Sequence, residues 1–361
     1  MIEAPRPQRR FEGRKIRAGA VGVGRMGRHH ARVYAQLADC ELVGVVDADT
    51  DRAEAIADKH GCRVFSTVEE LIDAGVDVCS IAVPTTYHRL TAEPLLKAGV
   101  ACLIEKPLAQ DAASAKAIKD LSERTGTILM VGHIERFNPI MRAMQQSTAN
   151  GLEIVPRFIQ VHRVSPMTFR SVDVGVVMDM MIHDLDVVLM LMGGREPETI
   201  RAAGVSVVTD HEDICNAWLE FKTDRGRCVA NMTASRLALK TERVTRITGE
   251  NGYIKIDYAT KAGTVIRRRA NELQMSEIRE QLRGGADLTS LNWHELVNVE
   301  PLMIDDAEPI VMEITSFLKA VRTGDRPPID AEAGFANVRT AERIVKAIRE
   351  SAPAPLASRR G

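Results

Sequence analysis

The stretch from residue 16 to residue 47 constrains the fold of this chain more than any other. An apolar run leads into Gly22, Gly24 and Gly27, spaced G-x-G-x-x-G, and is followed by a helical pattern and a second apolar run. In a strand–turn–helix unit the first glycine permits the tight turn. The second lets a pyrophosphate approach the backbone, and the third lets the helix pack closely on the strand. Because a helix N-terminus also attracts phosphate, the pattern predicts a dinucleotide-binding βαβ unit.

The second apolar run ends at Asp47, 20 residues beyond Gly27. A carboxylate at that spacing can accept hydrogen bonds from the hydroxyls of the adenosine ribose, and it repels a 2′-phosphate. We therefore predict that the cofactor is NAD rather than NADP.

Strands and helices alternate from residue 15 to 134, which predicts a doubly wound parallel sheet of the Rossmann type. The expected strands are 16–23, 41–46, 63–65, 76–83, 101–105 and 127–132, and the expected helices are 25–38, 51–59, 67–73, 86–98 and 111–125. Functional residues of such sheets lie at the carboxyl ends of the strands. Those ends carry Asp47, Pro84-Thr85, Glu105-Lys106 and His133.

Residues 135–350 have a different pattern, with consecutive strands joined by short turns, which indicates antiparallel pairing. We predict an α+β domain with an open, mainly antiparallel sheet that binds substrate and forms oligomers. Its expected strands are 152–164, 198–208, 213–222, 226–234, 243–249 and 252–257, and its expected helices are 139–147, 175–192, 309–323 and 331–350. The last helix should pack back on the first domain, residues 260–305 fit no template, and residues 1–14 and 351–361 are expected to be disordered tails.

Composition excludes several functional classes. The net charge is −1 and aromatic residues make up 4%, which argues against a nucleic-acid-binding surface. No apolar run is long enough to span a bilayer. The six cysteines form no C-x-x-C pair, so we expect reduced core residues in a cytoplasmic protein and no metal site.

Two groups carry candidate chemistry. Lys106 ends a strand beside the expected cofactor crevice, where lost hydration lowers the pKa of an amine and makes it a usable proton carrier; the alternative is a surface lysine paired with Glu105. The bond to Pro107 can adopt a cis form. Asp179 and His183 lie one helical turn apart, so that the imidazole can shuttle a proton; the alternative is a core histidine beside solvated acids.

Polar residues near the sixth strand and after it are candidate substrate ligands. Arg136 and Asn138 follow that strand, where they face substrate or form the domain hinge. Arg163 and Arg170 flank a loop and are candidate anion clamps, although ordinary surface arginines would have the same pattern.

Together these motifs resemble the glucose–fructose oxidoreductase, inositol dehydrogenase and MocA (Gfo/Idh/MocA) family over about residues 15–350. The motifs are G-V-G-R-M-G, V-V-D-A-D, A-V-P-T-T-Y-H, E-K-P and D-M-M-I-H-D. The resemblance implies that Lys106, His183 and Asp179 are catalytic, with His183 favoured as the base. It also implies a cofactor site formed by Gly22, Gly24, Arg25, Met26, Gly27, Asp47, Pro84, Thr85, His88, Glu105 and Lys106.

Within that family, V-G-H-I-E-R-F-N-P and M-M-I-H-D-L-D are most similar to the UDP-N-acetylglucosamine 3-dehydrogenase branch. This similarity implies oxidation of the C3 hydroxyl of a nucleotide sugar to a 3-keto sugar, for amino-sugar biosynthesis of the lipid A or O-antigen type. It also implies a homodimer or homotetramer formed through the sheet of the second domain. The alternatives are a dehydrogenase of inositol, another polyol or another sugar, and a non-catalytic NAD-binding sensor.

Overall fold

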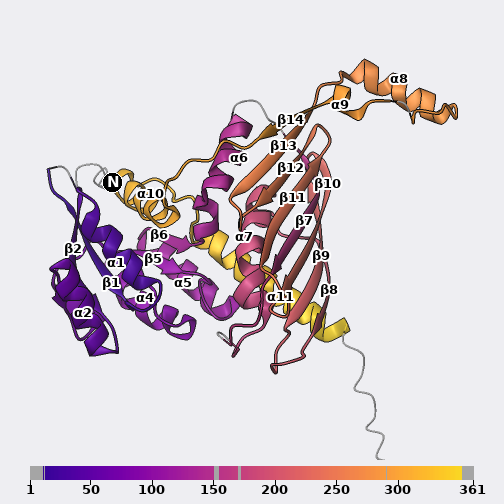
Figure 1. Ribbon diagram of the computed structural model, residues 1–361. Coiled ribbons are helices and arrows are strands. Elements are labelled where there is room, and N and C mark those ends of the chain that lie inside the picture. The colour runs from indigo at the N-terminus through magenta and orange to yellow at the C-terminus, as the bar shows by residue number, and fades with distance from the viewer. Residues whose placement is uncertain (1–10, 12, 150–153, 170–171, 290, 352–361) are drawn as a thin grey trace, which may run out of the picture. The chain divides into compact units, whose positions relative to one another are not determined.

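A computed structural model describes residues 11, 13–149, 154–169, 172–289 and 291–351 (Figure 1). The chain divides into two compact units, each built from separate segments. The first unit combines residues up to 137 with 182–196 and 307–346, and the second combines 138–181, 197–306 and the residues from 347.

The first unit contains a six-stranded parallel sheet in the order β3-β2-β1-β4-β5-β6. Its strands are β1 (Ile16–Val21), β2 (Cys40–Val46), β3 (Arg63–Val64), β4 (Val78–Ile81), β5 (Ala101–Glu105) and β6 (Leu129–Gly132). The strand order reverses between β1 and β4, and this reversal creates the crevice in which such sheets bind ligands. The predicted doubly wound fold is confirmed.

Helices connect these strands. They are α1 (Gly27–Gln36), α2 (Thr50–His60), α3 (Val68–Asp73), the 3₁₀ turn η2 (Thr85–Tyr87), α4 (His88–Lys97), α5 (Ala112–Thr125) and the 3₁₀ turn η3 (Ile134–Phe137). Asp49, Thr67 and Asp111 cap the N-termini of α2, α3 and α5 by accepting backbone N–H bonds. These residue types are preferred there because their short side chains satisfy otherwise unpaired donors.

Three later helices also belong wholly or largely to the first unit: α7 (Ile182–Leu191), α10 (Pro309–Thr323) and α11 (Ala331–Ser351, up to residue 346). Arg136 of η3 binds the buried carboxylate of Asp186 on α7 through two contacts of 2.6 Å. The Asn337 amide of α11 donates to the Ile182 carbonyl at 3.1 Å. The packing units therefore differ from the predicted continuous domains 15–134 and 135–350. Polar contacts between residues far apart in the sequence join η3 to α7 and α7 to α11 within the first unit.

The second unit is built on an eight-stranded mixed sheet in the order β14-β13-β12-β11-β7-β10-β9-β8. Its strands are β7 (Pro156–Val164), β8 (Thr199–Val205), β9 (Ile214–Thr223), β10 (Gly226–Ser235), β11 (Glu242–Gly249), β12 (Gly252–Asp257), β13 (Ala262–Arg268) and β14 (Val297–Pro301). All neighbours pair antiparallel except β7 and β10, which are parallel. The predicted mainly antiparallel sheet is confirmed.

The second unit also contains α6 (Pro139–Ala149), α8 (Glu272–Arg283) and α9 (Trp293–Leu296). The region 260–305, for which no element was predicted, thus contains the edge strand β14, its neighbour β13 and two helices. Figure 1 shows α8 projecting beyond the sheet, and none of its residues is buried. Met275, Ile278 and Leu282 of α8 are spaced i, i+3 and i+7, so the sequence does contain a helical period here, although none of these residues is buried.

Two predicted segments differ in the structure. The helix expected at 175–192 begins as a π-helical turn, η4 (Val177–Met181), and only α7 is α-helical. The predicted N-terminal tail is ordered near its end, because Phe11 is buried and Arg14 binds Asp77 at 2.6 and 2.8 Å. The remainder of that tail, and residues 352–361 of the other, lie outside the described residues.

No helix among the described residues has the length and hydropathy needed to cross a bilayer.

Candidate active site

The glycine turn after β1 is shaped for close approach of a ligand. Gly22 has a φ of +78°, and a Cβ there would lie 2.7 Å from the Val83 nitrogen. A Cβ on Gly27 would lie 1.7 Å from the Gly22 carbonyl oxygen. The start of α1 can therefore pack against the turn only because residue 27 has no side chain. A Cβ on Gly24 would meet nothing nearer than the Arg52 guanidinium at 4.0 Å. The backbone at Gly24 is therefore open on its outer side.

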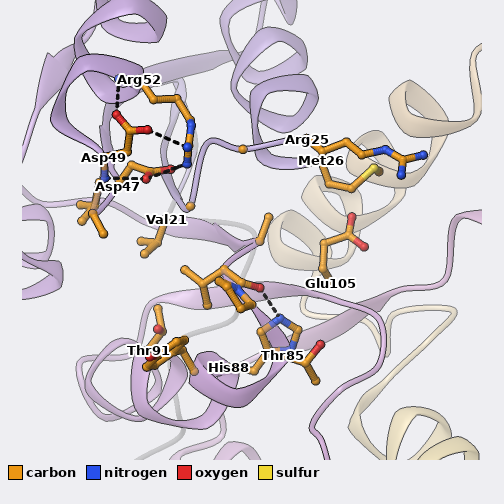
Figure 2. Close-up of a pocket in the computed structure, with 18 of the residues that line it drawn as sticks. Val21, Arg25, Met26, Asp47, Asp49, Arg52, Thr85, His88, Thr91 and Glu105 are labelled. Carbon is orange, nitrogen blue, oxygen red and sulfur yellow. Dashed lines mark hydrogen bonds and ion pairs between the residues drawn. The ribbon is translucent and has the colours of Figure 1, made fainter. Parts of the chain in front are cut away.

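A cavity of about 770 Å³ lies beside this turn in the first unit (Figure 2). Its volume is within the range of small-molecule pockets. It is lined by the carboxyl ends of β1, β2, β4 and β5 and by the turns that follow them. Of the predicted cofactor residues, it includes Gly22, Gly24, Arg25, Met26, Asp47, Pro84, Thr85, His88, Glu105 and Lys106. Gly27 is the exception, since it serves the packing of the turn.

Asp47 is held in place at one side of the cavity (Figure 2). Its carboxylate accepts the N–H groups of Val23 at 2.7 Å and Asp49 at 2.9 Å. Arg52 binds the same carboxylate at 3.2 and 3.4 Å and binds Asp49 at 2.7 Å. Sequence reasoning missed Arg52, although a basic residue five positions after the acid is a usable signal.

His88 is buried between the turn that follows β4 and the turn that follows β5. Its ring nitrogens lie 3.0 Å from the Pro107 carbonyl oxygen and 3.0 Å from the Val83 carbonyl oxygen. Burial lowers the pKa of His88, outweighing these carbonyl contacts. A neutral imidazole has one N–H, so it donates to one of these two carbonyl groups at a time. The resemblance did not specify which contacts His88 makes.

Lys106 follows β5 directly, and its bond to Pro107 is cis. The Lys106 backbone N–H donates to the Glu105 carboxylate at 3.3 Å, and both residues line the cavity. Burial raises the pKa of Glu105, but the His30 ring at 2.9 Å and the Lys106 charge outweigh it, so the pKa is lowered on balance. Glu105 is therefore an ionised, buried anchor for the residue that follows it.

His183 lies in the first turn of α7, and Asp179 lies in the π-helical turn before it. π-Helical turns within helices occur frequently at functional sites. The Arg136–Asp186 ion pair and the Asn337–Ile182 hydrogen bond flank His183 and fix the start of α7. His183 and Lys106 both belong to the first unit.

Two of the other predicted substrate ligands, Arg136 and Asn138, form hydrogen bonds within the protein. The Arg136 guanidinium is engaged by Asp186 and by the Pro328 carbonyl oxygen at 3.1 Å. The Asn138 side chain accepts the Ile140 N–H at 3.2 Å. Arg163 is buried on β7, and Arg170 lies outside the described residues. Their role toward substrate stays a prediction.

The residues present fit a dinucleotide. Gly24 leaves the outer side of the turn open where a Cβ would stand, α1 begins at this turn, and Asp47 follows β2 where a ribose diol would be bound. Gly22 and Gly24 would face the pyrophosphate, and Thr85 and Lys106 line the same cavity.

Known protein families agree with this geometry. The model of the oxidoreductase family with an NAD-binding Rossmann fold, GFO_IDH_MocA, matches residues 16–133. The model of that family's C-terminal alpha/beta domain matches residues 167–356.

Individual relatives are consistent with these matches. The chain is 39% identical over 243 residues to a UDP-N-acetylglucosamine 3-dehydrogenase of Acidithiobacillus ferrooxidans, covering 67% of this chain and 74% of the relative. A solved structure of that enzyme has a TM-score of 0.80 at 33% identity and covers 93% of this chain and 98% of its own. An inositol 2-dehydrogenase of Rhizobium meliloti is 26% identical to this chain over 343 residues. The alignment covers 93% of this chain and 97% of the relative. The chain is thus an oxidoreductase that uses NAD, and it belongs to the Gfo/Idh/MocA family.

Proposed function

We propose that this chain is a dehydrogenase that oxidises a secondary hydroxyl of a sugar, specifically the C3 hydroxyl of UDP-N-acetylglucosamine, to a 3-keto sugar. The product would enter amino-sugar biosynthesis of the lipid A or O-antigen type. One observation carries the chemistry: Lys106 lines the cofactor cavity directly after β5, with its backbone anchored by the buried Glu105. The 39% identity to a UDP-N-acetylglucosamine 3-dehydrogenase supports the substrate.

The protein residues would orient the sugar and move one proton. When bound, NAD supplies a hydride acceptor. His183 takes the proton of the hydroxyl, and the Lys106 ammonium polarises the hydroxyl oxygen; the reverse assignment satisfies the same proton balance. Asp179 orients the imidazole, and Asn138, Arg136 and Arg163 are the proposed substrate ligands.

A second candidate is oxidation of inositol or another polyol. The inositol 2-dehydrogenase relative aligns over 93% of this chain, whereas the alignment with the nucleotide-sugar enzyme covers 67%. The two functions require the same cofactor and proton carriers, so they differ in the groups that bind the rest of the substrate.

A substrate screen tests the proposal. The purified protein is incubated with NAD and, separately, UDP-N-acetylglucosamine, other UDP-sugars and myo-inositol, and NADH formation is followed by ultraviolet absorbance. We expect the highest kcat/KM with UDP-N-acetylglucosamine and a product lighter by two hydrogens. A higher kcat/KM with myo-inositol would favour the second candidate, and NAD binding without any turnover would favour a sensor.

The proposal extends to assembly and compartment. We propose a cytoplasmic homodimer or homotetramer that forms through the eight-stranded sheet of the second unit. Support comes from the alternation of buried and more exposed residues along β9 and β10, which gives the sheet one less covered face. Light scattering at several concentrations measures the oligomer, and a monomer throughout would contradict this part.

A further inference from the structure

Glu313, in the second turn of α10, has a buried carboxyl group that the proposed reaction does not use. Glu313 is 0% exposed to solvent, and neither of its carboxyl oxygens has a hydrogen-bond partner among the described residues. Buried polar groups are nearly always paired, so this group calls for a physical explanation.

Glu313 lies in a cluster with His30 of α1 and Glu105 of β5. One side-chain atom from each of the three residues lies within 4.8 Å of those of the other two, and all three are buried. The His30 ring also contacts the Ser80 hydroxyl at 3.0 Å on its other nitrogen, and the Tyr34 hydroxyl lies 2.8 Å from Ser80. The cluster therefore joins α10, α1 and the carboxyl end of β5, and α10 packs against α1 (Figure 1).

Two carboxyl groups this close, away from water, cannot both be ionised, because like charges strongly disfavour each other at low dielectric. Glu105 has a hydrogen-bonding His30 ring and the Lys106 backbone N–H, whereas Glu313 has neither. Burial and, secondly, the charge of Glu105 raise the pKa of Glu313 well above its usual value. The single proton of the pair thus belongs on Glu313.

We propose that Glu313 is a positioning residue: held as a neutral acid beside the Glu105 carboxylate, it completes the cluster that fixes the end of β5 from which Lys106 departs. A carboxylic acid can donate one hydrogen bond, and the acceptor that the cluster offers is the Glu105 carboxylate. The role of Lys106 rests on the proposed function, whereas the protonation of Glu313 does not.

Other ionisable groups lie on the elements packed around this part of α10. They are His29, His30 and Arg32 on α1, Glu105 and Lys106 at β5, His133 after β6, Glu135 and Arg136 on η3, and Glu308 at the start of α10. Arg32 forms an ion pair with Glu308, and Arg136 forms one with Asp186. Within the cluster itself, the carboxylate next to Glu313 is that of Glu105.

The first experiment uses the pH dependence of stability in the substrate-free full chain. Above the ordinary carboxyl pKa the unfolded chain loses the Glu313 proton and the folded chain keeps it, so the wild type loses stability as pH rises. Glu313→Gln is neutral in both states and lacks this loss. We expect the folding constant of Glu313→Gln relative to wild type to rise with pH from 5 to 9, by up to about tenfold per unit.

The matched control is Glu332→Gln on α11, whose carboxylate is exposed and pairs with Lys119. Its folding constant relative to wild type should stay constant over the same pH range. A pH-independent ratio for Glu313→Gln would overturn the proposal. One equivalent of bound divalent metal in the wild type, lost in Glu313→Gln, would overturn it too, since the cluster would then be a metal site.

The second experiment addresses the positioning of Lys106. Glu313→Ala should lower kcat per folded molecule by roughly 10- to 100-fold, the order expected from misplacing a reacting group. The KM for NAD should stay unchanged, and Glu313→Gln should restore kcat. If Glu313→Ala retains wild-type kcat, Glu313 does not position Lys106. If Glu313→Ala does not fold, Glu313→Gln alone serves as the test. A kcat of Glu313→Gln as low as the kcat of Lys106→Ala would then contradict the proposal.

Discussion

Asp47 and Arg52 form an ion pair at the side of the cavity where we propose that the adenosine ribose of the cofactor binds. The carboxylate that would bind the ribose diol is itself held by a guanidinium, which also contacts Asp49. A 2′-phosphate would be repelled by Asp47, yet it would find a cation immediately beside it. We therefore expect cofactor preference to depend on the balance between Asp47 and Arg52.

We predict that Asp47→Ser raises the ratio of kcat/KM for NADP to kcat/KM for NAD by roughly 10- to 100-fold, the value of one or two charge-assisted hydrogen bonds. Arg52, released from Asp47, would supply the new contact to phosphate. Steady-state kinetics with both cofactors measures the ratio. Adding Arg52→Ala should cancel the gain, and equal use of both cofactors by the wild type would contradict the role of Asp47.

A second residue-scale prediction concerns the proton carriers. Lys106→Ala and His183→Ala should each lower kcat by roughly 10²- to 10⁴-fold, the usual contribution of positioned proton transfer. The double variant should lose much less than the product of the two effects, because both residues serve one proton. NAD affinity, measured calorimetrically, should be unchanged in His183→Ala, since that residue does not line the cavity. Near-normal turnover of His183→Ala would refute its assignment.

Residues that act through the backbone or through local spacing could be predicted from the sequence. Gly22 and Asp47 belong to a short motif whose geometry follows from the spacing. Arg136 and Glu313 could not be assigned in this way, because their partners, Asp186 and Glu105, lie far away in the chain. A lone charged residue in a helical pattern does not reveal whether it is exposed or buried beside a partner.

At the scale of elements, the connection between η3 and α7 depends on one buried ion pair. We predict that Arg136→Ala lowers the free energy of unfolding by about 3–5 kcal/mol, because the Asp186 carboxylate would remain buried without its partner. Chemical denaturation measures this change, and Asp186→Asn in the same background should recover part of it. Arg89→Ala, which breaks the exposed pair with Glu93 on α4, should cost less than about 1 kcal/mol.

The loop between β8 and β9 is organised by another carboxylate. Buried Asp213 accepts the N–H groups of Val207, Val208 and Thr209 at 2.6 to 3.0 Å and the Thr209 hydroxyl at 2.8 Å. Burial raises the pKa of Asp213, but these donors outweigh it and lower the pKa well below its usual value. The loop is therefore stabilised by the ionised form.

From this arrangement we predict that Asp213→Asn lowers the free energy of unfolding by about 2–3 kcal/mol at neutral pH. Because the folded-state pKa is depressed, the wild-type advantage is present above the ordinary aspartate pKa and should shrink as pH falls below about 4. Urea unfolding at several pH values tests this. Exposed Asp210→Asn in the same loop serves as the control, and a pH-independent difference would contradict the mechanism.

Element prediction succeeded where burial leaves a clear pattern in the sequence. The continuous apolar runs of the parallel sheet and the alternating pattern of β9 and β10 are examples. It failed at η4, because no residue type marks a π-helical turn. It also missed α8, although Met275, Ile278 and Leu282 have helical spacing, and the mostly exposed β14.

For the whole molecule, the decisive feature is that neither packing unit is a continuous piece of chain. A Cβ on Gly334 of α11 would lie 2.5 Å from Val131 of β6 and 3.1 Å from Leu108, so helix and sheet are tightly packed. The sequence shows where helices occur but not which sheet they cover, since an amphipathic face fits many apolar surfaces.

We predict that residues 13–137 alone do not unfold cooperatively, because α10 and α11 would be missing from the surfaces they bury. The same fragment joined by a flexible linker to residues 307–346 should regain a cooperative thermal transition that NAD shifts upward. Calorimetry of the two fragments makes the comparison. Cooperative, NAD-responsive unfolding of the shorter fragment would refute the prediction.

This interleaving has a consequence during synthesis on the ribosome. The six strands of the parallel sheet emerge early, but α10 and α11, which complete their unit, emerge roughly 200 residues later. At about 5–20 residues per second, the nascent sheet waits on the order of 10–40 s with apolar surface uncovered. The chain should therefore engage holding chaperones while α10 and α11 are still being synthesised.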